Sequence, residues 1–367
     1  MSSSIDLVHI SDLHLVEDLY TTGGTFKSRS KGAKSHSRGI IAALSSTLGS
    51  FRERDSLLIV SGDVTTDGAS GSLRSAKAYL DQTQYSTPDR QYPIPCLGWP
   101  QDRRIVVPGN HDRYDGRWFP RQVESVAFEA ALELPSYYPF VRVHVPPDDP
   151  TFAVAFFVLN SVPSGDIQER YPRHKRPGVI AGGYVPDAMR SQLVLQSEGL
   201  SDTGRAIDLG GQEVNISGRT LVKVAIVHHH PVPNPNTDTR AWRHPVRTLK
   251  NAVFAETIAE GEALLKALWF AGVQLVLFGH KHQAFQSYID VHPNDFYADR
   301  NVDMPDWNRM WFACCPSTSQ YDQAKPGFYA IEVGKTCARL RQFSLQSRDD
   351  PVFTLDEASA VQLDYHI

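Results

Sequence analysis

Five apolar segments of the sequence each run directly into a turn that carries Asp, Asn or His. In the clearest of them, the run Ile105-Val106-Val107 reaches Pro108-Gly109 and is followed at once by Asn110-His111-Asp112. A short, β-branched apolar run bounded by a turn is typical of a buried strand. The pattern therefore predicts five buried strands that deliver polar groups to a sheet edge, and the other four are Ile5–Ile10, Leu57–Val60, Leu221–Val227 and Val273–Phe278.

Apolar residues at helical spacing follow several of these strands. The spacing predicts helices over residues 40–51, 73–80, 121–134, 187–196 and 252–270. Two further strands are predicted at 141–145 and 151–159, and antiparallel strands that finish a sheet at 285–289, 311–315, 327–333 and 339–345. The first half alternates strands with helices and the second half is rich in strands, which indicates the α/β class.

Long polar segments interrupt this pattern at residues 15–37, 87–101, 162–184, 199–219 and 290–310. Connections in compact domains usually span about 4–6 residues, so longer ones are typical of loops that surround a functional site. The sequence contains no internal repeat and no clean linker. Because the polar turns extend from residue 12 to residue 282, we expect one domain over residues 1–367 to hold them all.

Composition narrows the possible functions. The 367 residues are 41% hydrophobic and 21% charged, which is ordinary for a globular protein, and the formal net charge of −4 argues against a general nucleic-acid binder. No apolar run approaches the ~20 residues of a membrane span, and the first residues lack the pattern of a signal peptide. Four cysteines, two of them adjacent, form a poor disulfide framework, so we expect a reducing, cytoplasmic setting. These features do not define an oligomeric state.

The polar turns contain the side chains that bind transition metals in proteins. Each turn is weak evidence alone, but all five directly follow predicted strands. Their order is D-x-H (Asp12, His14), G-D (Asp63), G-N-H-D (Asn110, His111, Asp112), H-x-P (His229, Pro231) and G-H-x-H (His280, His282). This arrangement resembles the calcineurin-like metallophosphoesterase superfamily, whose signature has five such blocks in this order, and the resemblance extends over residues 6–282.

The resemblance implies a four-layer α/β/β/α sandwich of two mixed sheets, with a dimetal site at the strand ends. Asp63 is implied as the carboxylate shared by two divalent ions. The other implied ligands are Asp12, His14 and His282 for one ion, and Asn110, His229 and His280 for the other. A set this rich in histidine favours Mn, Fe or Zn over Ca or Mg, which prefer oxygen ligands. In the family mechanism a metal-bridging hydroxide attacks phosphorus, and His111 stabilises or protonates the leaving group.

Two assignments near these ligands stay open. In the family, the histidine ligand of the fourth block lies two residues before a proline, which selects His229. His228 would then point into the core, and His230 would line the pocket and bind substrate. Asp112, as a catalytic candidate, either orients His111 or caps the turn that follows it.

Basic residues near the turns are candidates for substrate binding. Arg113 directly follows the G-N-H-D block, and Arg240 lies in the long segment after the histidines. The segment from Lys27 to Arg38 contains several basic residues and no acid. It is either a solvated loop or a flap that attracts an anionic substrate to the metal ions.

Within the superfamily, the blocks look most like those of compact bacterial enzymes grouped with class III cyclic nucleotide phosphodiesterases. We therefore expect a phosphodiesterase that acts on a small nucleotide or a similar diester. The alternatives are a phosphomonoesterase or nuclease of the same superfamily and, in a different class, a binding protein without turnover. All seven implied ligands and His111 are present, which favours an enzyme. The long insertions would shape the pocket, so the blocks do not identify the substrate.

Overall fold

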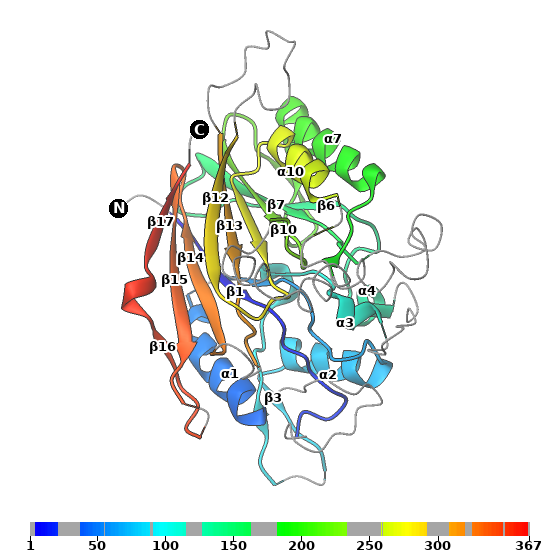
Figure 1. Cartoon of the computed structure of the whole chain (residues 1–367), viewed down its shortest axis with the longest axis vertical. Coiled ribbons are helices and arrows are strands. Elements are labelled where there is room, and N and C mark those ends of the chain that lie inside the picture. The colour runs from blue at the N-terminus through cyan, green and yellow to red at the C-terminus, as the bar shows by residue number, and fades with distance from the viewer. Residues whose placement is uncertain are drawn as a thin grey trace, which may run out of the picture.

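Two mixed β-sheets form the centre of the computed structural model, which describes residues 4–20, 37–54, 56–88, 91–114, 127–162, 182–232, 258, 260–291, 308–319, 325–347 and 349–365. The first sheet has the order β16-β15-β14-β1-β2-β5, with β17 beside β15, and the second has the order β12-β13-β11-β10-β7-β6 (Figure 1). The strands of the first sheet are β1 (Ile5–Ile10), β2 (Leu57–Val60), β5 (Arg104–Val106), β14 (Gly327–Val333), β15 (Cys337–Leu345), β16 (Phe353–Leu355) and β17 (Val361–Asp364). Those of the second are β6 (Phe140–His144), β7 (Phe152–Val158), β10 (Thr220–Ile226), β11 (Leu275–Phe278), β12 (Phe285–Val291) and β13 (Asn308–Cys314).

The strands that precede the polar turns run parallel, so their carboxyl ends share one edge of each sheet. In the first sheet, β2 pairs in parallel with both β1 and β5. In the second sheet, β10 pairs in parallel with β7 and β11, and β11 with β13. This arrangement collects the turns after β1, β2, β5, β10 and β11 at the carboxyl ends of the strands, as the sequence predicts.

Apolar side chains fill three layers of core. The inner faces of the two sheets enclose a cluster that includes Ile59, Phe156 and Val224. The outer face of the first sheet packs against α1 (Arg38–Arg52), α2 (Ser70–Asp81) and α4 (Ala127–Leu132). The outer face of the second packs against α7 (Asp187–Thr203) and α10 (Gly261–Phe270), which lie side by side in Figure 1. The predicted four-layer α/β/β/α sandwich is confirmed.

Short elements occupy several of the predicted insertions. The segment 87–101 contributes β4, and the segment 199–219 contains the end of α7 and a small hairpin, so neither is wholly loop. The short elements of the described chain, both inside and outside these insertions, are β3 (Gln84–Tyr85), β4 (Ile94–Pro95), β8 (Arg205–Ile207), β9 (Glu213–Asn215), α3 (Asn110–Arg113) and the 3-10 turns Gln101–Arg103 and Glu357–Ser359.

Two further predictions need correction. The helix α10, predicted over residues 252–270, begins at Gly261, because Glu260 adopts a left-handed conformation with φ of 60°; residues 252–257 and 259 of the predicted helix lie outside the described ones. The four late strands do not finish one antiparallel sheet. Instead, β14 and β15 belong to the first sheet, while β12 and β13 belong to the second, where β13 is parallel to β11. A run of alternating residues predicts a strand but does not choose its partner.

No helix in the described part of the chain combines the length and apolar character needed to cross a membrane.

Candidate metal centre

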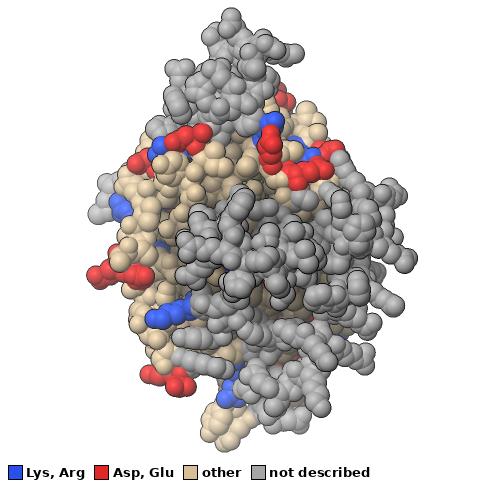
Figure 2. Space-filling view, viewed as in Figure 1, with Lys and Arg blue, Asp and Glu red and all other residues tan. Residues whose placement is uncertain are grey.

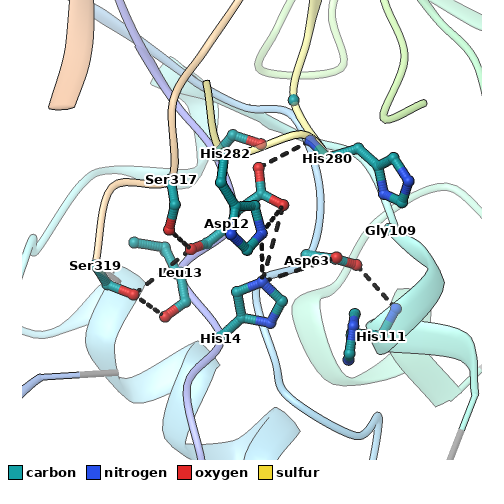
Figure 3. Close-up of polar contacts among 12 residues, drawn as sticks. Asp12, Leu13, His14, Asp63, Gly109, His111, His280, His282, Ser317 and Ser319 are labelled. Atoms are coloured by element: carbon teal, nitrogen blue, oxygen red, sulfur yellow. Dashed lines mark hydrogen bonds and ion pairs between the residues drawn. The ribbon is translucent and has the colours of Figure 1, made fainter. Parts of the chain in front are cut away.

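Side chains from five polar turns converge where the carboxyl ends of the two sheets meet. Asp12 and His14 follow β1, Asp63 follows β2, and Asn110 begins α3 directly after β5. His228 follows β10, while His280 and His282 follow β11. Figure 3 shows Asp12, His14, Asp63 and His282 pointing toward one another, with His280 and His111 on either side of Asp63. Four overlapping groups of three residues at this centre, one of which includes His229, place their possible ligand atoms within 4.8 Å of one another.

The backbone at this centre is held in an unusual conformation. Of the seven non-glycine residues with positive φ in the described chain, five are implied ligands, namely Asp12 (55°), His14 (49°), Asp63 (49°), His280 (75°) and His282 (56°). Such conformations cost about 1–3 kcal/mol each and concentrate at functional sites. Here hydrogen bonds between the turns oppose that cost, because the Asp12 and His14 N–H groups donate to the carbonyls of Gly62 and Asp63.

The first group of donor atoms consists of Asp12, His14 and His282. Asp12 Oδ1 lies 3.3 Å from His282 Nε2 and 3.8 Å from His14 Nε2, and the two Nε2 atoms are 3.3 Å apart. Asp12 is fully buried, and its Oδ1 makes no hydrogen bond within the described part of the chain. A buried carboxylate oxygen without a partner is unfavourable unless a cation compensates it. This geometry fits a divalent metal ion.

The second group consists of Asn110, His228 and His280, and Asp63 lies between the two groups. His228 Nε2 is 3.2 Å from Asn110 Oδ1 and 3.3 Å from His280 Nδ1. Asp63 Oδ2 lies 3.3 Å from His228 Nε2 and 3.9 Å from His14 Nε2. One carboxylate oxygen is therefore close to a possible ligand atom of each group.

His228 faces this centre, so its predicted place in the core is wrong. Along β10, Val224 and Ile226 face the first sheet and Ala225 and Val227 face the outer helices, so the same alternation turns His228 toward the first sheet, where the centre lies. His228 Nδ1 lies 2.8 Å from the carbonyl oxygen of Ser61. Because a carbonyl can only accept, Nδ1 carries a proton, and a neutral ring then presents Nε2 as a bare nitrogen.

The charges at the centre are strongly coupled. Burial alone would raise the pKa of Asp63, but His228, His111 and His14 hold it well below its usual value. Burial alone would lower the pKa of His228, but the Asp63 carboxylate raises it to about 9. Burial, with the positive charges of neighbouring histidines, lowers the pKa of His14 to about 3 and that of His280 well below its usual value. His14 and His280 are therefore neutral near pH 7, the form that binds metal ions.

Glycines in the blocks allow the turns to approach each other. At Gly62, which has φ of 101°, a Cβ would lie 2.4 Å from His228 Nδ1. At Gly109, a Cβ would lie 2.1 Å from Asp63 Oδ1. Any side chain at either position would displace a residue of the centre.

The catalytic candidates His111 and Asp112 have separate surroundings. The His111 backbone N–H donates to Asp63 Oδ1 at 2.8 Å, and His111 Nδ1 lies 2.8 Å from the carbonyl oxygen of Thr66. Asp112 accepts hydrogen bonds from the N–H groups of Gly109 and Thr65 at 2.8 and 2.7 Å. Asp112 therefore caps its turn and joins it to the turn after β2, rather than orienting the His111 ring.

The three candidate substrate-binding residues do not form a pocket among the described residues. His230 is fully buried, packs against Phe278 and Phe285, and places Nε2 3.4 Å from Cys314 Sγ, so it does not line the site. Arg113 is buried in an ion pair with Glu129, which contradicts its predicted role. Arg240 lies outside the described residues, as does most of the basic segment from Lys27 to Arg38.

Sequence reasoning missed a sixth polar turn, which follows β13. Ser317 Oγ donates to the Asp12 carbonyl at 3.0 Å and Ser319 Oγ donates to the Leu13 carbonyl (Figure 3). Thr318 Oγ1 accepts the Ser11 N–H at 3.0 Å. These bonds fix the loop that carries Asp12 and His14. The signal was present, because the apolar run before it ends in Pro-Ser-Thr-Ser.

Comparison with known proteins identifies the family. The family model described as calcineurin-like phosphoesterase matches residues 5–284. The chain belongs to this family. No curated protein shows significant sequence similarity to this member of it.

Solved structures agree with the fold. A dimetal phosphatase from Danio rerio superimposes with a TM-score of 0.54, at 11% identity, over 99% of each chain. PhoD superimposes with a TM-score of 0.50, at 10% identity, over 98% of this chain and 70% of its own. At this level of identity, the similarity shows a shared fold.

Proposed function

We propose that this calcineurin-like phosphoesterase is a dinuclear metal-dependent hydrolase whose substrate is a small phosphodiester. The position of Asp63 Oδ2, between the two groups of donor atoms, is the observation that carries the proposal. Two divalent ions bound there would supply Lewis-acid stabilisation of the phosphoryl oxygens and a water of lowered pKa. The donor chemistry, mostly imidazole with two carboxylates, supports Mn, Fe or Zn.

The proposed ligands differ from the sequence prediction at one position. Asp63 would be shared between the ions, with Asp12, His14 and His282 on one side and Asn110, His228 and His280 on the other. His228 replaces His229 because its Nε2 lies within 3.3 Å of the Asn110 and His280 ligand atoms of the second group and of the shared Asp63 Oδ2. The pairing of β1 with both β2 and β14 supports our proposal that residues 1–367 form one domain, because it ties the two ends of the chain into one sheet.

His111 is the proposed catalytic residue. Since the Thr66 carbonyl can only accept, His111 Nδ1 donates to it, which leaves Nε2 as the atom that gives or receives a proton. Its ring packs edge-on against that of His14, with centroids 4.8 Å apart, so this atom lies beside the ligands.

We expect His111→Ala to lower turnover of a phosphodiester by about 10²-fold, the size of a typical general acid–base contribution. Metal content should stay at the wild-type value, because the proposed ligands are unchanged. Steady-state kinetics and metal analysis of the same preparation would measure both, with His144→Ala on β6 as the matched control. Wild-type turnover in His111→Ala would remove this residue from the reaction.

The preference for a diester is tested by a paired assay. Metal-stripped protein is refilled with Mn²⁺ and given bis-p-nitrophenyl phosphate as diester and p-nitrophenyl phosphate as monoester. The proposal predicts faster turnover of the diester, which would justify a screen of cyclic and linear nucleotides. Faster turnover of the monoester would instead assign a phosphatase, the main alternative.

The distribution of charge on the surface bears on the class of substrate. On the face drawn in Figure 2, the described Lys and Arg side chains lie among Asp and Glu in small mixed groups rather than in a basic patch. This supports a small phosphate ester over nucleic acid as the substrate.

All four cysteines are free thiols, which supports the proposed reducing, cytoplasmic setting.

A further inference from the structure

Ser161 and His229 form a buried pair beside the candidate metal centre. Ser161 follows β7 and is fully buried. Its Oγ lies 3.2 Å from the backbone N of His229 and 2.8 Å from His229 Nδ1. The backbone N–H can only donate, so Ser161 Oγ accepts that bond. The hydroxyl proton needs an acceptor of its own, and His229 Nδ1 is the one within hydrogen-bond distance among the described residues.

This arrangement fixes the tautomer of His229. If the Ser161 hydroxyl donates to Nδ1, that nitrogen is bare, and the proton of the neutral ring is on Nε2. The opposite assignment would leave a buried O–H group without an acceptor, which is unfavourable. On His228 the Nδ1 proton is held by the Ser61 carbonyl, so Nε2 is the nitrogen that can lose its proton to bind a metal ion. The Ser161 hydroxyl therefore leaves Nδ1 of His229 without a proton, whereas the Ser61 carbonyl keeps a proton on Nδ1 of His228.

The His229 ring is also held against two proposed ligands. Its centroid lies 4.5 Å from that of His280 and 4.8 Å from that of His228. Gly183, with φ of 81°, lies close behind it, since a Cβ there would be 2.4 Å from His229 Cγ. The ring is thus confined between Gly183, Ser161 and the two neighbouring imidazoles.

We propose that Ser161 and His229 are positioning residues for the metal centre. Ser161 fixes the tautomer that keeps both His229 nitrogens from binding a metal ion, since Nδ1 accepts the hydroxyl proton and Nε2 carries its own. The His229 ring then holds the imidazoles of His228 and His280 in the geometry that the ion requires. The inference rests on the proposed metal-binding role of His228 and His280, and it is independent of which phosphate ester is hydrolysed.

Metal titration separates a positioning residue from a ligand. Metal-free wild-type, His229→Gln, Ser161→Ala and His228→Gln proteins are titrated with Mn²⁺ in a calorimeter. We expect His229→Gln and Ser161→Ala to bind two ions per chain, with affinity at one site lowered about 10- to 100-fold, as is typical for partners that orient metal ligands. His228→Gln should bind one ion. A single ion bound by His229→Gln, or wild-type affinity in it, would overturn the proposal.

A second readout needs neither metal nor turnover. Two-bond ¹H–¹⁵N correlation spectra of the metal-free protein, labelled on histidine and assigned with His229→Gln, report which ring nitrogen carries the proton. We expect a bare Nδ1 on His229 in the wild type and loss of that preference in Ser161→Ala. A proton on Nδ1 in the wild type would contradict the inference. By contrast, a wild-type protein that binds no Mn²⁺ but shows the expected tautomer would refute the proposed function and leave the tautomer assignment standing.

Discussion

Replacing Asp63 by asparagine is expected to lower phosphodiester turnover by at least about 10³-fold, because metal stabilisation of the reaction amounts to several kcal/mol. The substitution should also reduce bound Mn²⁺. Asparagine can keep its Oδ1 as acceptor for the His111 N–H, so the turn should stay folded. Its NH₂ group would take the place of Oδ2, and an amide nitrogen of this kind does not bind a metal ion.

The matched control for this variant is Asp102→Asn, an exposed aspartate in the 3-10 turn before β5, at the far end of that strand from the centre. Circular dichroism and thermal melts of both proteins would establish that they are folded, and kinetics with metal analysis would measure the effect. Near-wild-type turnover in a folded Asp63→Asn protein would exclude Asp63 as the shared ligand.

Replacing His228 by glutamine should remove one of two bound ions and lower turnover by about 10²- to 10³-fold, since a stabilising contact to the reacting oxygens is lost with it. A glutamine side chain at this position has the length to keep a donor near the Ser61 carbonyl, but it lacks the ring-nitrogen lone pair that faces Asn110 and His280. Metal counting by mass spectrometry under native conditions, together with kinetics, measures both effects.

His144→Gln is the control for removal of a histidine elsewhere in the second sheet. If His228→Gln retains both ions, while His229→Gln loses one, the assignment made from the proline spacing would be right and the one made from the geometry wrong.

Much of the fold follows from the sequence because each buried strand ends abruptly in a polar turn. Leu57–Val60 and Ile105–Val107 are apolar on both faces, as strands covered on both sides must be, and Ile5–Ile10 is apolar except for Asp6 and His9. The parallel pairing of these strands brings Asp12, Asp63 and Asn110 to one edge of the first sheet, and the facing second sheet places His280 against Asp12. The blocks therefore predicted both the family and the region of the centre.

The remaining details depend on interactions that sequence periodicity does not encode. Alternation along β10 puts His228 on the face that meets the first sheet, but the sequence alone does not show which face of the strand carries the centre. An alternating run does not specify which strand it will pair with, so the parallel pairing of β13 with β11 was missed. Ser161 and Ser317 act through side-chain hydrogen bonds to residues far along the chain, and a serine after a strand does not show which residue it will meet.

We propose that two groups of donor atoms, joined by Asp63, hold two metal ions. Native mass spectrometry of the metal-stripped wild-type protein, titrated with Mn²⁺, tests it most directly. We expect the wild-type protein to take up two ions per chain. The Asp63→Asn protein, measured in parallel, should take up fewer than two. Saturation of the wild type at one ion, or uptake of none, would contradict the dinuclear centre.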